Sequence, residues 1–222
     1  MRHFVAVVSA SVVAGSAFGG FSAGVASFTS VASFYEDGPA IAKFPSDWTT
    51  FVVTEDLAGL SDGGSFGKLS GGSGWNQWCL TASQGTMSVA SGVILANEVG
   101  AGLSFDLGPA LGNSGSGLHG FGGDFGFRDA DGKRVAGTIE LTLSTGDSLV
   151  HEISAGNPFA GFWTLDPAVT ITGMSLRPLG TAGENYRATV DQLYFGFAGV
   201  PAPGAFALLG MAGAVASRNR RR

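Results

Sequence analysis

The sequence predicts an all-β protein, a β-sandwich of jelly-roll type. Short runs of β-branched and aromatic residues recur along the middle of the 222-residue chain, with Gly, Pro or Asp at their borders. No stretch between these runs shows the 3.6-residue apolar period of a helix. Hydrophobic residues make up 45% of the chain and 17 residues are Phe, which is enough for a packed core. Seven or more evenly spaced strands without helices are typical of a β-sandwich.

The clearest element is a hairpin over residues 138–153. Ile139, Leu141 and Leu143 alternate with polar residues, and a turn at 145–147 leads into the returning strand 148–153. Asp129-x-Asp131-Gly132 is predicted to be a turn, because an EF-hand loop needs further acidic positions. The same reasoning predicts strands over residues 50–54, 86–90, 102–107, 121–128, 170–177 and 187–197. The glycine-rich stretches 61–74 and 108–123 are predicted to be loops at the ends of the sandwich.

The N-terminus has the pattern of a secretory signal peptide. Met1–His3 is a short charged region, residues 4–13 are apolar, and small residues follow. Cleavage is expected after Ala17 or after Ala26, and a run of this length is too short to remain in a bilayer. The later site divides the chain into a signal peptide (1–26), a β-sandwich domain (27–199) and a C-terminal segment (200–222).

Charge and cysteine content exclude several classes of function. The span from Glu36 to Asp191 holds all 17 acidic residues and seven of the 12 basic ones, a formal charge of −10. A domain with this charge repels phosphate backbones, so nucleic acid is not an expected partner. Cys79 is the only cysteine, which rules out an intrachain disulfide or a Cys-x-x-Cys metal site, and we expect it in the core.

The C-terminus combines a chain break, a short apolar run and a basic end. Pro201 and Pro203 precede residues 204–217, which are rich in Ala, Leu, Gly and Met and compatible with a helix. The run of about 14 residues is shorter than the ~20 of a stable span, so a transient membrane anchor is predicted. The basic end consists of Arg218, Arg220, Arg221 and Arg222.

This three-part tail, paired with an N-terminal signal peptide, resembles the PEP-CTERM sorting signal. The resemblance covers Val200 to Arg222, and its motif reads Pro201-Ala202-Pro203, where the family has Glu in the middle. It implies export by the Sec machinery of a Gram-negative bacterium and a transient stay in the inner membrane. Processing by an exosortase-type enzyme and release to the cell surface or extracellular matrix would follow.

A second resemblance concerns the edges of the middle domain. Residues 34–38, followed by Trp48, are similar to the opening of jelly-roll carbohydrate-binding modules, and residues 188–195 are similar to their closing strand. The resemblance implies a structural Ca²⁺ held by Glu36 or Asp37 together with Asp191. Backbone carbonyls would have to complete the six to eight oxygen ligands that Ca²⁺ takes.

A sugar-binding site is predicted separately from the local sequence at Trp75-Asn76-Gln77-Trp78. Aromatic rings stack on sugar faces and amides bond hydroxyl groups, so Trp75, Asn76 and Trp78 are the candidate residues. Extracellular polysaccharide is the corresponding partner. The alternative is that both rings cover the core.

No catalytic residue is predicted. Gly63–Gly67 matches G-x-S-x-G and Gly115–Gly120 matches G-x-G-x-x-G, but neither is followed by a helical pattern. His119 is expected in a glycine loop, and His151 on the same strand face as Leu149 and Ile153. The sequence therefore favours an exported, non-catalytic surface or matrix protein. A carbohydrate-binding module and an unrecognised glycoside hydrolase are the alternatives.

Overall fold

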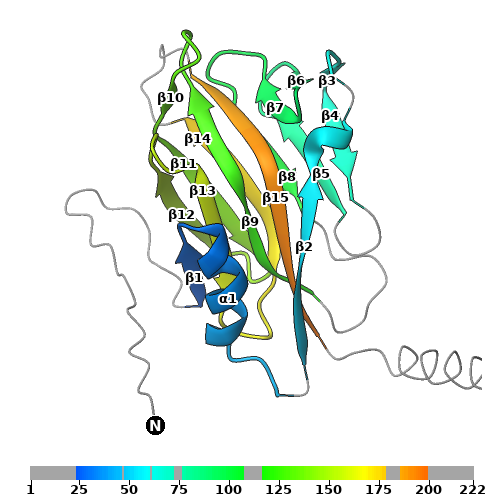
Figure 1. The fold of residues 1–222 in the computed structure, drawn as a ribbon, viewed down its shortest axis with the longest axis vertical. Coiled ribbons are helices and arrows are strands. Elements are labelled where there is room, and N and C mark those ends of the chain that lie inside the picture. Colours follow the sequence, from blue (N-terminus) through cyan, green and yellow to red (C-terminus); the bar gives the residue numbers. More distant parts are fainter. Residues whose placement is uncertain are drawn as a thin grey trace, which may run out of the picture.

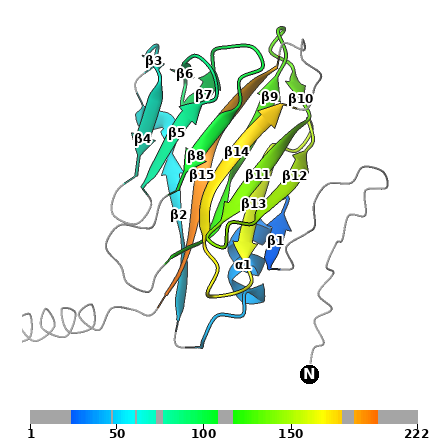
Figure 2. The ribbon, with the colours of Figure 1, turned by 180° about the vertical axis from the view of Figure 1, so that it is seen from behind.

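The computed structural model describes residues 24–46, 48–60, 62–72, 77–107, 117–178 and 186–199. In this part of the chain two antiparallel sheets pack face to face (Figures 1 and 2). The nine-stranded sheet A has the order β1-β13-β9-β15-β7-β6-β3, with β10 paired to β9 and β2 paired to β15. The six-stranded sheet B has the order β12-β11-β14-β8-β5-β4. The predicted jelly-roll β-sandwich is confirmed.

The strands of sheet A are β1 (Val25–Phe28), β2 (Thr49–Asp56), β3 (Ser65–Phe66), β6 (Met87–Ala90), β7 (Val93–Ala96), β9 (Gly117–Arg128), β10 (Arg134–Val135), β13 (Phe159–Thr164) and β15 (Arg187–Gly199). The strands of sheet B are β4 (Lys68–Gly71), β5 (Trp78–Ala82), β8 (Leu103–Asp106), β11 (Gly137–Leu143), β12 (Ser148–Ile153) and β14 (Ile171–Pro178). A short 3₁₀ turn, η1 (Leu57–Gly59), follows β2, and the single helix α1 (Val31–Ile41) follows β1.

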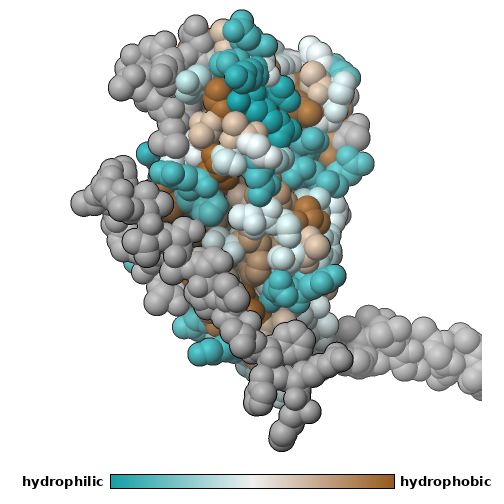
Figure 3. All heavy atoms as spheres, turned by 60° about the vertical axis from the view of Figure 1, so that its left-hand side comes forward, coloured by the Kyte–Doolittle hydropathy of each residue, from teal (hydrophilic) through white to brown (hydrophobic). Residues whose placement is uncertain are grey.

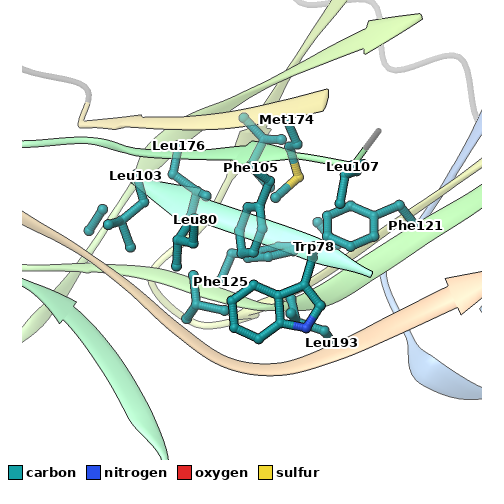
Figure 4. Packing of buried hydrophobic residues seen from close by; sticks show 14 of the residues in the cluster. Trp78, Leu80, Leu103, Phe105, Leu107, Phe121, Phe125, Met174, Leu176 and Leu193 are labelled. Atoms are coloured by element: carbon teal, nitrogen blue, oxygen red, sulfur yellow. The ribbon is translucent and has the colours of Figure 1, made fainter. Parts of the chain in front are cut away.

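The main core lies between the two sheets. Ile139, Leu141 and Leu143 on β11 are almost fully buried while their neighbours face outward, as the period-2 pattern predicts. Trp78 extends from β5 into the same core, where its ring meets Phe105 edge-on at 6.2 Å between centroids (Figure 4). Apolar side chains of both sheets therefore interdigitate, as expected of a sandwich.

Helix α1 departs from the all-strand prediction for this region. Ser30 caps it, since the Ser30 hydroxyl accepts a hydrogen bond from the Ser33 amide at 3.2 Å. Gly38 and Pro39 near its end disfavour helix and masked the pattern in the sequence. The helix lies on the outer face of sheet A (Figure 1). It forms because Phe34 is fully buried against that face.

Both glycine-rich stretches predicted as loops contain strands. The first holds β3 and β4, and the second ends in β9, which begins at Gly117. Consequently His119, expected in a loop, is a buried strand residue. Their glycine content concealed the strands, because glycine has no side chain to show an alternating pattern. Strands β1, β5, β7, β10 and β13 were also not predicted. His151 lies on the same face of β12 as the buried Leu149 and Ile153, as predicted, and its ring contacts Phe162.

Strand β1 bears on the site of signal cleavage. Val25–Phe28 pairs along its length with β13, and the Gly24 carbonyl accepts a hydrogen bond from the Leu165 amide at 2.6 Å. Cleavage after Ala26 would remove half of this strand, which favours cleavage after Ala17. The predicted signal region up to residue 23 and the segment 200–222 lie outside the described residues. Within the described part, no helix has the length and apolar character needed to cross a membrane.

Candidate functional site

Three neighbouring strands give sheet A a glycine floor on its outer face. Gly161 of β13 pairs with Gly122 of β9, and Gly196 of β15 pairs with Gly120 of β9. Side chains at paired positions point to the same face of a sheet, so these residues leave a shallow hollow beneath α1. A Cβ atom at Gly120 would lie 2.6 Å from the Trp163 ring.

Aromatic side chains fill this hollow and attach α1 to the sheet. Trp163 is fully buried, and its indole N–H donates to the Phe34 carbonyl at 3.1 Å. The Phe34 ring lies 5.7 Å from that of Trp163 and 6.0 Å from that of Phe159. Phe28 and Tyr194 complete the layer, which is separate from the main core. Helix α1 is therefore held in place chiefly by one side chain, Phe34.

The position of α1 sets Tyr35 beside a group of polar residues. The Tyr35 ring is 37% exposed and meets the Tyr194 ring edge-on at 5.9 Å. Its hydroxyl group bonds the Thr54 hydroxyl on β2, while the Tyr194 hydroxyl donates to the Gln192 side chain at 2.7 Å. An exposed tyrosine thus lies next to a fixed amide.

Two carboxylates adjoin these tyrosines. Asp124 on β9 faces the point on β15 where the pairing register shifts between Val190 and Leu193, and this irregularity contains Asp191. Burial raises the pKa of the Asp124 carboxyl, and the charge of Asp191 raises it further, whereas Arg134 lowers it. Burial and the nearby carboxylates likewise raise the pKa of Tyr194. The two carboxylates therefore interact electrostatically.

Together Tyr35, Asp124, Asp191, Gln192 and Tyr194 form what we call the tyrosine–carboxylate cluster. It provides a ring face, hydroxyl donors, an amide and carboxylate acceptors on one surface. Such a combination suits a ligand with apolar CH faces and many hydroxyl groups. The resemblance to carbohydrate-binding modules covers the two edges of this cluster, residues 34–38 and 188–195. No pattern in the sequence indicates Asp124, because the strand signal at 121–128 comes from apolar residues.

The sugar-binding residues predicted from the sequence, Trp75, Asn76 and Trp78, are not part of the tyrosine–carboxylate cluster. Trp75 and Asn76 lie outside the described residues. Trp78 is only 3% exposed and points into the core (Figure 4), so its ring does not offer a surface for stacking. The alternative for Trp78, a core residue, is what the structure supports. Cys79 is half-buried on β5 rather than in the core as expected.

The residues predicted to hold Ca²⁺ do not form a metal-binding group. Glu36 and Asp37 are exposed on α1, and Asp191 is exposed on β15 beside Asp124. Across the described ranges, no three His, Cys, Asp or Glu residues come close enough to hold a metal ion together. The arrangement does not fit the six to eight oxygens that Ca²⁺ takes, so this site stays a prediction without support from the geometry.

A second aromatic group lies near the other end of α1. Phe44 stacks on Trp48 at 5.9 Å, and both rings contact His119. The His119 Nδ1 atom lies 3.0 Å from both the Thr164 hydroxyl and the Val169 carbonyl. Burial lowers the pKa of His119. The neutral, hydrogen-bonded imidazole therefore has a packing role, attaching the connection before β2 to the sheet.

The outer face of sheet B is polar. Paired positions across its strands present Thr81, Ser104, Ser175 and Glu140 in one row. Arg177 bonds Glu140 at 2.9 Å. Of the exposed large hydrophobic side chains in the described residues, this sheet carries only Val150. The described residues of this face therefore offer no aromatic surface comparable with that at Tyr35.

Comparisons with known proteins return structural neighbours only. No protein-family profile and no curated protein matches the sequence. A family 29 carbohydrate-binding module from Piromyces equi is similar over 67% of this chain and 90% of its own, at 11% identity and a TM-score of 0.36. A family 36 carbohydrate-binding module in complex with calcium and xylotriose is similar over 64% of this chain and 98% of its own, at 13% identity and a TM-score of 0.28.

A third neighbour is a family two carbohydrate esterase from Cellvibrio japonicus. It is similar over 70% of this chain but only 36% of its own, at 11% identity and a TM-score of 0.36. These likenesses concern backbone arrangement, and no residue role passes from these proteins to this chain.

Proposed function

We propose that this chain is an exported, non-catalytic surface protein whose β-sandwich binds polysaccharide through the tyrosine–carboxylate cluster. The observation that carries the proposal is the exposed Tyr35 ring held against Tyr194 beside the Gln192 amide and two carboxylates. The ring supplies a stacking surface, and the polar groups bond sugar hydroxyls. The repulsion between Asp124 and Asp191 supports a ligand-binding role, because functional sites retain electrostatic cost that a purely structural surface would lose.

Replacement of Tyr35 by alanine tests this proposal. We expect the isolated domain to bind at least one member of a panel of soluble polysaccharides, and Tyr35→Ala to weaken that binding about tenfold, the effect of losing ~1.4 kcal/mol of ring stacking. The assay is affinity electrophoresis or calorimetry. Phe51→Ala is the matched control, since Phe51 is also 37% exposed but lies on β2 stacked on Phe197. Equal losses in both variants, or binding unaffected by Tyr35→Ala, would contradict the proposed site.

Glycoside hydrolysis is the second candidate, favoured by Asp124 alone. A carboxyl group whose pKa is raised, with a second carboxyl group beside it, is the arrangement that supplies a general acid and a second catalytic carboxylate. Reducing ends released from a bound polysaccharide, and lost in Asp124→Asn, would support it. Tight binding without new reducing ends supports the non-catalytic proposal.

Export and sorting are proposed on the termini alone. The N-terminal pattern supports Sec-dependent export, and the Pro201-Ala202-Pro203 motif with its terminal arginines supports processing by an exosortase-type enzyme at the inner membrane. The intact mass of the protein recovered outside the cell tests both ends. A start at residue 18 and a chain lacking residues 204–222 are expected, and a released protein with its arginines intact would contradict processing.

A further inference from the structure

Three arginines lie in one row across sheet A. Arg128 on β9 pairs directly with Arg134 on β10 and with Arg187 on β15. The neighbouring residues Val135, Phe127 and Ala188 face the core, so the three arginine side chains point outward. β10 lies at the upper end of the molecule, beyond the reach of α1 (Figure 1), and that end is strongly hydrophilic (Figure 3). We call Arg128, Arg134 and Arg187 the arginine row.

No ion pair of the described protein compensates the charges of this row, although Asp124 and Arg134 interact electrostatically. Like charges directly opposite one another destabilise a sheet. The one ion pair in the described ranges joins Arg177 to Glu140 on the other sheet. Arg128 donates only to the Gly132 carbonyl, at 2.9 Å. The Arg187 Nε atom is buried and has no hydrogen-bond partner. A buried donor without a partner costs free energy, and a bound anion would recover that cost where the Arg187 side chain turns to expose this atom.

The arginine row continues the surface proposed to bind polysaccharide. Asp124, Gly126 and Arg128 follow one another on the outer face of β9, so the row lies about 13 Å from Asp124 at ~3.3 Å per residue. Between them lies Gly126, which has no side chain, and beside it on β15 the small side chain of Thr189, whose hydroxyl oxygen would be 2.9 Å from a Cβ atom at Gly126. A short oligosaccharide on the tyrosine–carboxylate cluster would therefore extend to the guanidinium groups. Planar guanidinium groups bind carboxylate and sulfate in a bidentate manner.

We propose that the arginine row is a subsite for an acidic substituent, a carboxylate or sulfate group, on the bound polysaccharide. This inference rests on the proposed function and names its substrate class. Residues 36–191 carry a formal charge of −10, and this charge, together with the nearby carboxylates of Asp124 and Asp191, repels a densely charged polyanion. The ligand is accordingly a mostly neutral polysaccharide with spaced acidic groups, and nucleic acid is disfavoured for the same reason.

Two pairs of polymers test the inference. Within each pair the polymer backbone is the same, and one member is charged while the other is neutral. Sparsely substituted dextran sulfate is compared with dextran, and sparsely substituted carboxymethyl cellulose with hydroxyethyl cellulose, which separates sulfate from carboxylate. We expect the domain to bind at least one charged polymer about tenfold more tightly than its neutral counterpart, as one charge-assisted contact of ~1.4 kcal/mol provides. Arg187→Gln should abolish this preference without changing the affinity for the neutral polymer. Arg177→Gln on sheet B is the matched control and should leave the preference intact.

The outcomes distinguish this inference from the proposed function. Equal affinity for charged and neutral polymers, both weakened by Tyr35→Ala, would overturn the acidic subsite and leave polysaccharide binding standing. Binding to none of the polymers would remove the polysaccharide. The anion site would stand if sodium sulfate, relative to sodium chloride at equal ionic strength, raised the melting temperature of the wild type more than that of Arg187→Gln. Tighter binding to single-stranded DNA than to the charged polymers, lost in Arg187→Gln, would overturn the assignment to a sugar.

Discussion

Replacing Phe34 by alanine is expected to lower the free energy of unfolding by about 3–5 kcal/mol, the range for deleting a fully buried phenylalanine ring. Phe34 has no exposed surface, and it contacts the rings of Phe28, Phe159, Trp163 and Tyr194. Denaturant unfolding followed by tryptophan fluorescence measures the loss. Because Phe34 anchors α1, the same change should also abolish polysaccharide binding through displacement of Tyr35.

Hydrogen exchange separates this local effect from general unfolding. In Phe34→Ala the amides of α1 and β1 should exchange faster. The amides of β8, β11 and β14 in the main core should still exchange only through global unfolding, at the free energy measured for that variant. Val150→Ala, which shortens a side chain 45% exposed on sheet B, serves as the control and should change neither stability nor binding. Uniform loss of protection across both sheets would show that the aromatic layer beneath α1 and the main core do not unfold independently.

The second large effect is expected at the glycine floor. Gly120→Ala places a methyl group 2.6 Å from the Trp163 ring, which cannot withdraw because it is fully buried and hydrogen-bonded to α1. Overpacking of this kind costs about 1–3 kcal/mol. The measurement is again denaturant unfolding. Gly156→Ala is the control, since nothing lies within 4 Å of the added methyl group and no loss is expected.

A double-mutant cycle identifies Trp163 as the cause. In a Trp163→Leu background the cost of Gly120→Ala should fall by about 1 kcal/mol or more, because residues in contact do not act additively. Equal costs in both backgrounds would mean that glycine is needed at position 120 for a reason other than space for the indole ring.

The sequence predicted the sandwich where alternating side chains mark a strand, as at Ile139, Leu141 and Leu143. It did not predict α1, whose stability comes from Phe34 packing on Trp163, a residue 129 positions away. Nor did it predict the strand around His119, because four of the seven residues 117–123 are glycine and have no side chain that could show alternation. Tertiary packing decides both elements, and single-sequence patterns do not contain it.

The candidate site was predictable only in part. The resemblance to the edges of carbohydrate-binding modules pointed to Glu36, Asp37 and Asp191 as calcium ligands, and the same two segments supply Tyr35 and Asp191 to the tyrosine–carboxylate cluster. Asp124 and the arginine row depend on the register between β9, β10 and β15, which no local pattern reveals. The sugar-binding prediction at Trp78 is not supported, because that ring is buried in the core and the exposure of an aromatic ring does not follow from its neighbours in sequence; Trp75 lies outside the described residues.

Mapping the bound ligand on the domain by amide chemical shifts tests the central claim most directly. An oligosaccharide prepared from a polymer that the domain binds should shift the resonances of Tyr35, Asp124, Gln192 and Tyr194, with those of Arg128 and Arg187 added when it carries an acidic group. Shifts confined to the outer face of sheet B, or to residues flanking 73–76, with α1 and β15 unchanged, would contradict a binding surface on sheet A.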